Sequence, residues 1–455
     1  MLGPSGKAVI VAALLLTPFL FMPLSACAAP DEDALGKADG YPVAPSLSES
    51  RLDRYRVGSF SALDTLGPAC TLAPARDPVP LATASPTNFT YRFHDATYTL
   101  DDYMQRQRAT AILVLHDGQI VAERYNYERT QAMRMVSHSM AKTITALGLV
   151  AALEAGAIRS FDDTAATYVP ELAGTLYGET KIVNLMRMAS GAKFVEDYSA
   201  NDDRTTYNRL TRQQGNIAAA RSVTEHAEPQ GERFNYAGAQ TQILGLVLRA
   251  ATHRTLCDYI DEKIWQPIGA EAKATWLLNP ADHFEIAQGD FNAALRDYGR
   301  LGLMLANDGM VAGKPVVSAE HLLDMTDAAR QPPAFRPGQM SWHNSTYSGY
   351  GLQVWLLPGS HRRFVLLGIY GQAIYVDPAL KLVVVHLAVG KDAARAIEVG
   401  ERGCARAKHR IRVDVLAERL EGDVDLAQGG VKRRLADLGK PDHGRLLVDA
   451  GAFEV

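Results

Sequence analysis

The sequence predicts an α+β fold, in which an antiparallel sheet flanked by helices is built from the N- and C-terminal parts of the folded region around a mostly helical insertion. Paired apolar runs meet at Asp117-Gly118 and again at Asp377-Pro378, and mostly helical sequence lies between them. The chain has 455 residues, of which 47% are hydrophobic and 22% charged, so it is long enough to bury a large core.

Composition divides the chain into four parts. Residues 1–26 run from a basic residue through an apolar stretch to small residues, as a secretory signal peptide does. Residues 27–88 are rich in Pro, Ala, Ser and Asp, which favours a tether and a loosely attached lead-in. Residues 89–411 are predicted to be the folded domain, with the helical insertion at about 165–290. Residues 412–455 form a C-terminal extension of unknown role.

The last three residues of the signal peptide and the residue after it read "LSAC", Leu24 to Cys27, which resembles the bacterial lipobox. In a lipobox the cysteine is lipidated and becomes the mature N-terminus. We therefore expect an exported, periplasmic lipoprotein that is anchored to the bacterial membrane through Cys27. Ordinary cleavage near Ala28 or Ala29 is the alternative.

Charge and cysteine usage narrow the class of ligand. The net charge of -4 comes from 47 basic and 51 acidic residues that are interspersed, so no nucleic-acid surface is expected. Small uncharged or zwitterionic ligands fit better. After cleavage Cys70, Cys257 and Cys404 remain; at most one internal disulfide forms among them, and their spacing fits no zinc site.

Several elements follow from local patterns. "ATAILVLHDGQIVAERYNY" (residues 109–127) predicts a hairpin, because a type I′ turn needs positive φ at both central residues. "RRFVLLGIYGQAIYVD" and "LKLVVVHLAVG" are expected to form the closing strand pair. "TLCDYIDEKIWQPIG", ended by Pro267 and Gly269, and "NAALRDYGRLGLMLANDG", ended at Gly309, are predicted to be helices.

The candidate nucleophile lies at the start of an apolar helix. "SHSMAKTITALGLVAALEAG" carries no charge from Thr143 to Leu153, yet Lys142 stands three residues after Ser139. On a helix this spacing puts both side chains on one face. Burial and the positive end of the helix dipole should lower the pKa of the lysine, and a neutral amine can take the proton of the serine hydroxyl.

Ser-x-x-Lys alone is a weak signal, since "SGAK", Ser190 to Lys193, is a second copy with no apolar helix after it. A helix-capping serine with a snorkelling lysine is the alternative for the first copy. His138 is a poor candidate for the base, because neighbours on a helix point in different directions. The sequence contains no G-x-S-x-G, H-E-x-x-H or P-loop motif, and neither a metal nor an organic cofactor is needed.

The order of motifs points to a family. In "PQGERFNYAGAQTQILGLVL", Tyr236 precedes a small residue and an apolar helix, and "LLGIYGQAIYVDP" lies on the last strand pair. With the Ser139 helix, this order resembles the serine β-lactamase and penicillin-binding-protein superfamily, specifically its class C, esterase and 6-aminohexanoate-dimer hydrolase branch. The resemblance covers about residues 93–389 and includes "YVPELAG", "LMRMASG", "IWQPIGA" and "NAALRDYGRLGLMLANDG".

The resemblance implies a role for each matching residue. Ser139 would be the acylated nucleophile, Lys142 its proton acceptor, and Tyr236 the phenol that relays the proton to the leaving group. A phenol qualifies if a cation such as Lys142 holds its pKa down. The backbone amides of Ser139 and Ile369 would form the oxyanion hole, and Gly368 would be small so that substrate can pass close to the backbone.

Departures from the family pattern bear on the substrate. Leu366-Leu367-Gly368 stands where lactamases and carboxypeptidases carry Lys-Thr-Gly or His-x-Gly, so the group that would help to hold a substrate carboxylate is missing. Gly238 replaces the asparagine of Tyr-x-Asn. "EDYSANDD" looks like the dimer-hydrolase and esterase branch, in which Tyr198 would close over substrate and Asp202 could meet a substrate ammonium. A packed surface aromatic is the alternative for Tyr198.

The sequence thus favours an exported serine hydrolase that forms an acyl-enzyme and cleaves small amides or esters. The first alternative is a β-lactamase or D-Ala-D-Ala carboxypeptidase. The second is a catalytically inactive binding lipoprotein of the same fold. Gly238 and Leu366 favour it, whereas the joint presence of Ser139, Lys142 and Tyr236 argues against it.

Overall fold

The computed structural model describes residues 32–85, 89–93, 96–342, 346–391 and 393 of the chain. The expected signal peptide with Cys27, the third mature cysteine Cys404 and the C-terminal extension lie outside these residues. Within them, no helix combines the length and the apolar character that are needed to cross a membrane.

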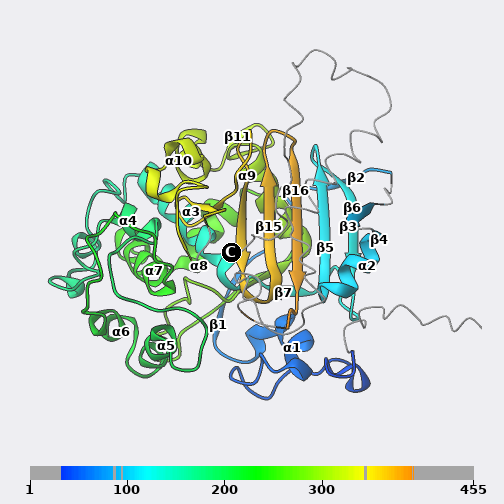
Figure 1. Ribbon diagram of the computed structural model, residues 1–455, viewed down its shortest axis with the longest axis horizontal. Coiled ribbons are helices and arrows are strands. Elements are labelled where there is room, and N and C mark those ends of the chain that lie inside the picture. The colour runs from blue at the N-terminus through cyan, green and yellow to red at the C-terminus, as the bar shows by residue number, and fades with distance from the viewer. Residues whose placement is uncertain (1–31, 86–88, 94–95, 343–345, 392, 394–455) are drawn as a thin grey trace, which may run out of the picture.

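An eight-stranded sheet forms the centre of the molecule (Figure 1), in the order β12-β13-β14-β15-β16-β5-β6-β2. Strand β5 (Ala109–His116) pairs antiparallel with β16 (Leu382–Ala388), with Val114 opposite Val384. The two ends of the folded region therefore share one sheet, as the sequence predicts. Strand β2 (Ala82–Thr83) at one edge is parallel to β6. The remaining strands of this sheet are β6 (Gln119–Tyr125), β12 (Gly349–Tyr350), β13 (Trp355–Leu356), β14 (Phe364–Gly368) and β15 (Gln372–Asp377).

The turns of this sheet test the predicted hairpins. Asp117 and Gly118 both have positive φ, 48° and 78°, so the predicted turn between β5 and β6 is confirmed. The closing region contains three strands where two were expected. The backbone turns at Tyr370 and Gly371, whose φ values are 62° and 94°. This turn divides "RRFVLLGIYGQAIYVD", which was expected to be one strand, into β14 and β15.

Helices cover the sheet and fill the insertion (Figure 1). Helix α9 (Leu295–Ala306) packs on β5, β15 and β16, and a Cβ added at Gly302 would lie only 2.4 Å from Cγ1 of Val383. Helix α3 (Ala141–Glu154) is buried against α7 (Gly238–Thr252) and α8. The other α-helices are α1 (Asp53–Phe60), α2 (Leu100–Arg106), α4 (Ile182–Met186), α5 (Asp203–Gln214), α6 (Asn216–Ser222), α8 (Leu256–Ile260) and α10 (Ala319–Thr326).

The lead-in is not a loose tether, which corrects the expectation for the described part of residues 27–88. Its strand β1 (Ala69–Leu72) begins a second sheet of order β1-β8-β9-β7, with β8 (Ala274–Leu277), β9 (Phe291–Ala294) and β7 (Arg134–Val136). Val57 of α1 is fully buried, and the ring of Phe60 lies edge-on to His138 with centroids 4.8 Å apart. Apolar burial against distant segments holds this stretch.

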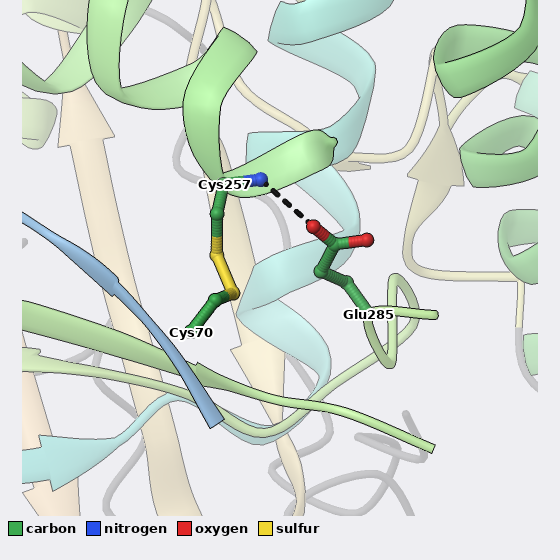
Figure 2. Close-up of side chains that lie close together, drawn as sticks. All are labelled: Cys70, Cys257 and Glu285. Carbon is green, nitrogen blue, oxygen red and sulfur yellow. Dashed lines mark hydrogen bonds between the residues drawn. A yellow bond between two sulfur atoms is a disulfide. The ribbon is translucent and has the colours of Figure 1, made fainter. Parts of the chain in front are cut away.

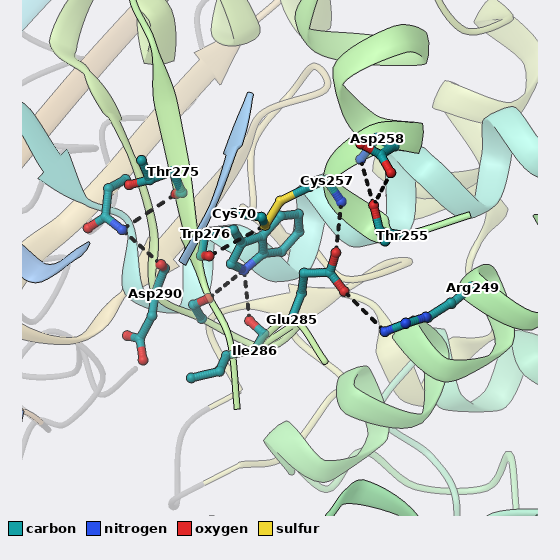
Figure 3. The surroundings of a disulfide bond; sticks show 12 residues. Cys70, Arg249, Thr255, Cys257, Asp258, Thr275, Trp276, Glu285, Ile286 and Asp290 are labelled. Carbon is teal, nitrogen blue, oxygen red and sulfur yellow. Dashed lines mark hydrogen bonds and ion pairs between the residues drawn. A yellow bond between two sulfur atoms is a disulfide. The ribbon is translucent and has the colours of Figure 1, made fainter. Parts of the chain in front are cut away.

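A disulfide between Cys70 and Cys257 ties the lead-in to the helical insertion, with 6.4 Å between the Cα atoms (Figure 2). The carboxylate of Glu285 accepts the Cys257 backbone N–H at 3.1 Å, and Arg249 lies 4.0 Å from its other oxygen (Figure 3). Burial raises the pKa of Glu285. Because the bridge joins residues 187 positions apart, it restricts a long loop of the unfolded chain.

Two small hairpins complete the described strands. They are β3 (Thr90–Phe93) with β4 (Ala96–Thr99), and β10 (Met310–Val311) with β11 (Lys314–Pro315). The predicted insertion at about 165–290 holds α4 to α8 as expected, and it also supplies β8 to the second sheet.

Candidate active site

Ser139 lies on a tight turn at the start of α3. The turn is a 3-10 helix, His138–Met140, and His138 has a φ of 43°, which is uncommon for a residue with a side chain. From Met135 to Ala152, Ser139 alone is partly exposed, while all its neighbours are buried. The turn therefore presents this hydroxyl at the surface of an otherwise apolar core.

Lys142 reaches back to that hydroxyl. Its Nζ lies 2.9 Å from Ser139 Oγ and 2.8 Å from the carbonyl oxygen of Gln288, and the residue is only 3% exposed. Burial lowers the pKa of Lys142 to about 8, although the negative charges of Glu196 and Asp290 oppose the shift. A neutral Lys142 can donate to Gln288 and still offer its lone pair to the Ser139 proton. The lowered pKa agrees with the expectation from sequence.

Tyr236 completes the group. Its side chain is hydrogen-bonded to that of Ser139, Lys142 Nζ lies 5.1 Å from its ring centroid, and it stacks on Trp355. The expectation that cations hold its pKa down is wrong. Burial raises the pKa of Tyr236, and the charge of Glu196 raises it further. Tyr236 is therefore a neutral phenol with a proton to donate.

Glu196 is a site residue that the sequence interpretation missed. It is buried, with Oε2 accepting the Gly238 N–H at 2.6 Å and Oε1 accepting the Tyr198 hydroxyl at 3.2 Å. Its charge acts on both Lys142 and Tyr236, and burial raises its own pKa. The signal available was its place two residues before Tyr198 in "EDYSANDD". Three aspartates in the same stretch made it indistinguishable from a solvated acid.

The two residues expected to contact substrate in this loop have different positions. Tyr198 is partly exposed and has a φ of 62°. Its hydroxyl donates to Glu196, which holds the side chain beside the site, and the guanidinium carbon of Arg204 lies 4.8 Å from the centroid of its ring. Asp202 does not face substrate, which corrects the expectation. Its side chain is fully buried and accepts the N–H groups of Thr205 at 2.7 Å and Tyr198 at 2.9 Å. It caps α5 and fixes the loop.

The end of β14 lies against the nucleophile turn. A Cβ at Gly368 would lie 2.3 Å from the carbonyl oxygen of Ser137 and 3.2 Å from Cβ of His138. The approach of the protein's own backbone is therefore sufficient to require glycine at this position. That substrate also passes close to the backbone here stays a prediction. Ile369, which follows Gly368, is held beside the turn that carries Ser139, and Leu366 is buried in the apolar core.

Comparisons with known proteins identify the family of the chain. A family model described as Beta-lactamase matches residues 97–399. The chain is 25% identical over 369 residues to a 6-aminohexanoate-dimer hydrolase of Paenarthrobacter ureafaciens, a match that covers 78% of this chain and 90% of the relative.

Solved structures show the same fold. A Bacillus anthracis protein, provisionally named as a 6-aminohexanoate-dimer hydrolase, superposes with a TM-score of 0.70 and 21% identity over 84% of this chain and 97% of that chain. An octameric penicillin-binding protein homologue from Pyrococcus abyssi gives a TM-score of 0.50 and 18% identity, over 65% of this chain and 74% of that chain.

Proposed function

Because the chain belongs to the Beta-lactamase family, we propose that it is a serine hydrolase that forms an acyl-enzyme on Ser139 and cleaves small amides or esters. The observation that carries the proposal is the contact of 2.9 Å between Lys142 Nζ and Ser139 Oγ. With its pKa lowered to about 8, the buried amine is neutral in a useful fraction of molecules near neutral pH.

The chemistry follows from these groups. Neutral Lys142 takes the Ser139 proton as Oγ attacks the substrate carbonyl, and the backbone N–H groups of Ser139 and Ile369 stabilise the oxyanion. Tyr236 gives its proton to the leaving group as the carbonyl–heteroatom bond breaks, and the proton held by Lys142 replaces it. Water then cleaves the acyl-enzyme, with the proton transfers reversed.

The substrate we propose is a small amide or ester of the kind taken by 6-aminohexanoate-dimer hydrolases or carboxylesterases. The relative from Paenarthrobacter ureafaciens supports it. So does the buried, apolar Leu366, which leaves no cation there to compensate a lactam carboxylate. A β-lactamase or D-Ala-D-Ala carboxypeptidase is therefore the second choice. A non-catalytic binding protein would have no use for the joined Ser139, Lys142 and Tyr236.

A comparison of substrates tests this proposal. We expect p-nitrophenyl acetate or butyrate, or an ω-amino amide, to be turned over with a kcat/KM at least about a hundredfold above that of any penicillin or cephalosporin. That ratio needs roughly 2.7 kcal/mol of differential transition-state binding. Nitrocefin cleaved as fast as the esters would contradict the proposal and put the β-lactamase first.

We further propose that the protein is exported and anchored to the bacterial membrane through a lipid on Cys27, on the strength of "LSAC" after the apolar segment. The Cys70–Cys257 disulfide suits an oxidising compartment. Radiolabelled palmitate should enter the protein, and Cys27→Ala should release it from the membrane. Absence of label together with an unchanged location of the variant would refute the anchor.

A further inference from the structure

The two backbone amides that would form the oxyanion hole each have a neighbour with an uncommon backbone conformation. His138, which precedes Ser139, has a φ of 43°, and Tyr370, which follows Ile369, has a φ of 62°. A residue with a side chain adopts positive φ at a cost in free energy, so this conformation persists only where the surroundings hold it. The positions of both amide N–H groups therefore depend on what fixes His138 and Tyr370.

One side chain of the lead-in touches both of these residues. The ring of Phe60, the last residue of α1, lies edge-on to His138 with centroids 4.8 Å apart and edge-on to Tyr370 with centroids 5.4 Å apart. The rings of His138 and Tyr370 are 5.9 Å apart, so the three rings form a triangle. All three residues are buried, and Phe60, Tyr370 and Ile369 belong to one apolar cluster. Because edge-on ring contacts are directional, Phe60 orients both of its neighbours.

Hydrogen bonds restrain the His138 ring only weakly. Its Nδ1 lies 3.4 Å from Oδ1 of Asp290, which is long for a hydrogen bond. Its Nε2 is buried and has no hydrogen-bond partner among the residues that the structure describes. Packing against Phe60 and Tyr370 is therefore the main restraint on this ring.

Helix α1 is fixed to the rest of the domain, so Phe60 is presented from a firm support. Asp53, at the start of the helix, pairs with Arg108 at 3.2 Å. The buried guanidinium of Arg56 donates to the carbonyl oxygen of Gly390, and it lies 4.4 Å from the centroid of the Tyr370 ring. This support comes from a segment that precedes residue 97, where the family match begins.

We propose that Phe60 is a positioning residue, which holds the backbone N–H groups of Ser139 and Ile369 together as an oxyanion hole by packing against both His138 and Tyr370. The inference rests on the proposed function, and it gives the lead-in a role in catalysis. Without the ring, His138 and Tyr370 relax toward ordinary backbone angles and the two donors move apart. This change weakens stabilisation of the transition state more than binding of the substrate.

Two esters that differ at the carbonyl group provide the test. In p-nitrophenyl acetate the developing charge falls on oxygen, whereas in the thiono analogue, O-(4-nitrophenyl) thioacetate, it falls on sulfur, a weak hydrogen-bond acceptor. The ratio of their kcat/KM values, divided by the same ratio for hydrolysis by hydroxide, reports the contribution of the oxyanion hole. We expect a corrected ratio of at least about one hundred for wild-type protein. Phe60→Ala should lower it about tenfold, through kcat rather than KM.

Two further variants separate this role from simple packing. Leu35→Ala is the matched control, because it removes a fully buried side chain from the same apolar cluster of the lead-in. It should lower the stability and keep the wild-type ratio. Phe60→Leu keeps much of the volume without the ring, so it should lower the ratio by a smaller factor. It carries the test if circular dichroism shows that Phe60→Ala does not fold. In folded Phe60 variants the midpoint of the pH profile, which reports Lys142, should stay in place.

The outcomes distinguish this inference from the proposed function. A wild-type ratio near one, a ratio that is unchanged in the folded Phe60 variants, or an equal fall in Leu35→Ala would overturn the inference. Labelling of wild-type protein by a fluorophosphonate separates the two proposals. Wild-type protein that is labelled on Ser139, with a ratio that does not respond to Phe60, refutes only the role of Phe60. Wild-type protein that is neither labelled nor active on either ester refutes both.

Discussion

The chain contains Ser-x-x-Lys twice, and the two copies have opposite surroundings. In the first, Ser139 is partly exposed and Lys142 is buried at 2.9 Å from its hydroxyl. In the second, Ser190 is buried and its hydroxyl accepts the N–H of Ala192 at 3.3 Å. Lys193 is exposed and paired with Glu225 at 2.7 Å. The hydroxyl and the amine of the second copy therefore serve separate neighbours.

The same contrast governs the electrostatics. Burial lowers the pKa of Lys142 to about 8, whereas the hydrogen bond and charge of Glu225 raise the pKa of Lys193. Gly191, with a φ of 76°, turns the chain inside the second copy, so its serine and lysine never share a helical face. Only in the first copy does a buried helix follow the tetrapeptide and bring its lysine to its serine.

Replacing each of the two serines should give the largest difference in kcat between the two copies. Ser139→Ala should abolish acylation and lower kcat by at least about 10⁴-fold, because it removes the nucleophile. Ser190→Ala should leave the rate within a few-fold of wild type. Burst kinetics with p-nitrophenyl acetate measure both variants. Equal losses of kcat in the two variants would contradict the distinction between the two copies.

Replacing each of the two lysines should give the next largest difference in kcat between the two copies. Lys142→Met removes the proton acceptor at similar volume, and we expect kcat to fall by about 10³-fold. Lys193→Met loses only an exposed ion pair and should retain wild-type kcat. Circular dichroism controls for folding of both variants. A large loss in Lys193→Met would show that the second copy supports the site.

The pH profile should follow Lys142. Only the neutral amine accepts a proton, so kcat/KM should rise about tenfold per pH unit at acidic pH and level off above a pKa of about 8. Lys193 stays protonated throughout this range because its pKa is raised, so Lys193→Met should leave the profile in place. A profile that is flat from pH 6 to about 9 would contradict the assignment of Lys142 as the base.

The smallest effect should come from the carboxylates near each lysine. The charge of Glu196 raises the pKa of Lys142, so Glu196→Gln should move the midpoint of the pH profile to lower pH by a fraction of a unit. Glutamine can still accept the Gly238 N–H. Glu225→Gln, next to Lys193, is the matched control and should leave the midpoint unchanged. A shift toward higher pH in Glu196→Gln would contradict the stated electrostatics.

Local patterns made part of this molecule predictable. The hairpin at Asp117-Gly118 needs only a turn and two apolar runs, and the Ser139–Lys142 pair needs only helical spacing. The lead-in was missed because its stability is nonlocal: Leu72 pairs with Ala274 about 200 residues later along the chain. The residue pattern within the lead-in gives no indication of such a contact.

The same limit applied inside the site. The role of Glu196 depends on Gly238 and Tyr198 converging on one buried carboxylate. The pKa of Tyr236 depends on burial and on the charge of Glu196, both of which raise it. The reason for Gly368 lies in the carbonyl of Ser137, more than 200 positions away in sequence. Residue types and order predicted the catalytic candidates, whereas packing decided their charges.

Intact-mass measurement after incubation with a fluorophosphonate, followed by peptide mapping, tests the central claim most directly. The expected result is one adduct per molecule, carried by the peptide that contains Ser139 and formed faster at pH 9 than at pH 7, because Lys142 is more often neutral at the higher pH. An adduct on the Ser190 peptide, or no adduct from folded protein, would contradict the claim that Ser139 is an activated nucleophile.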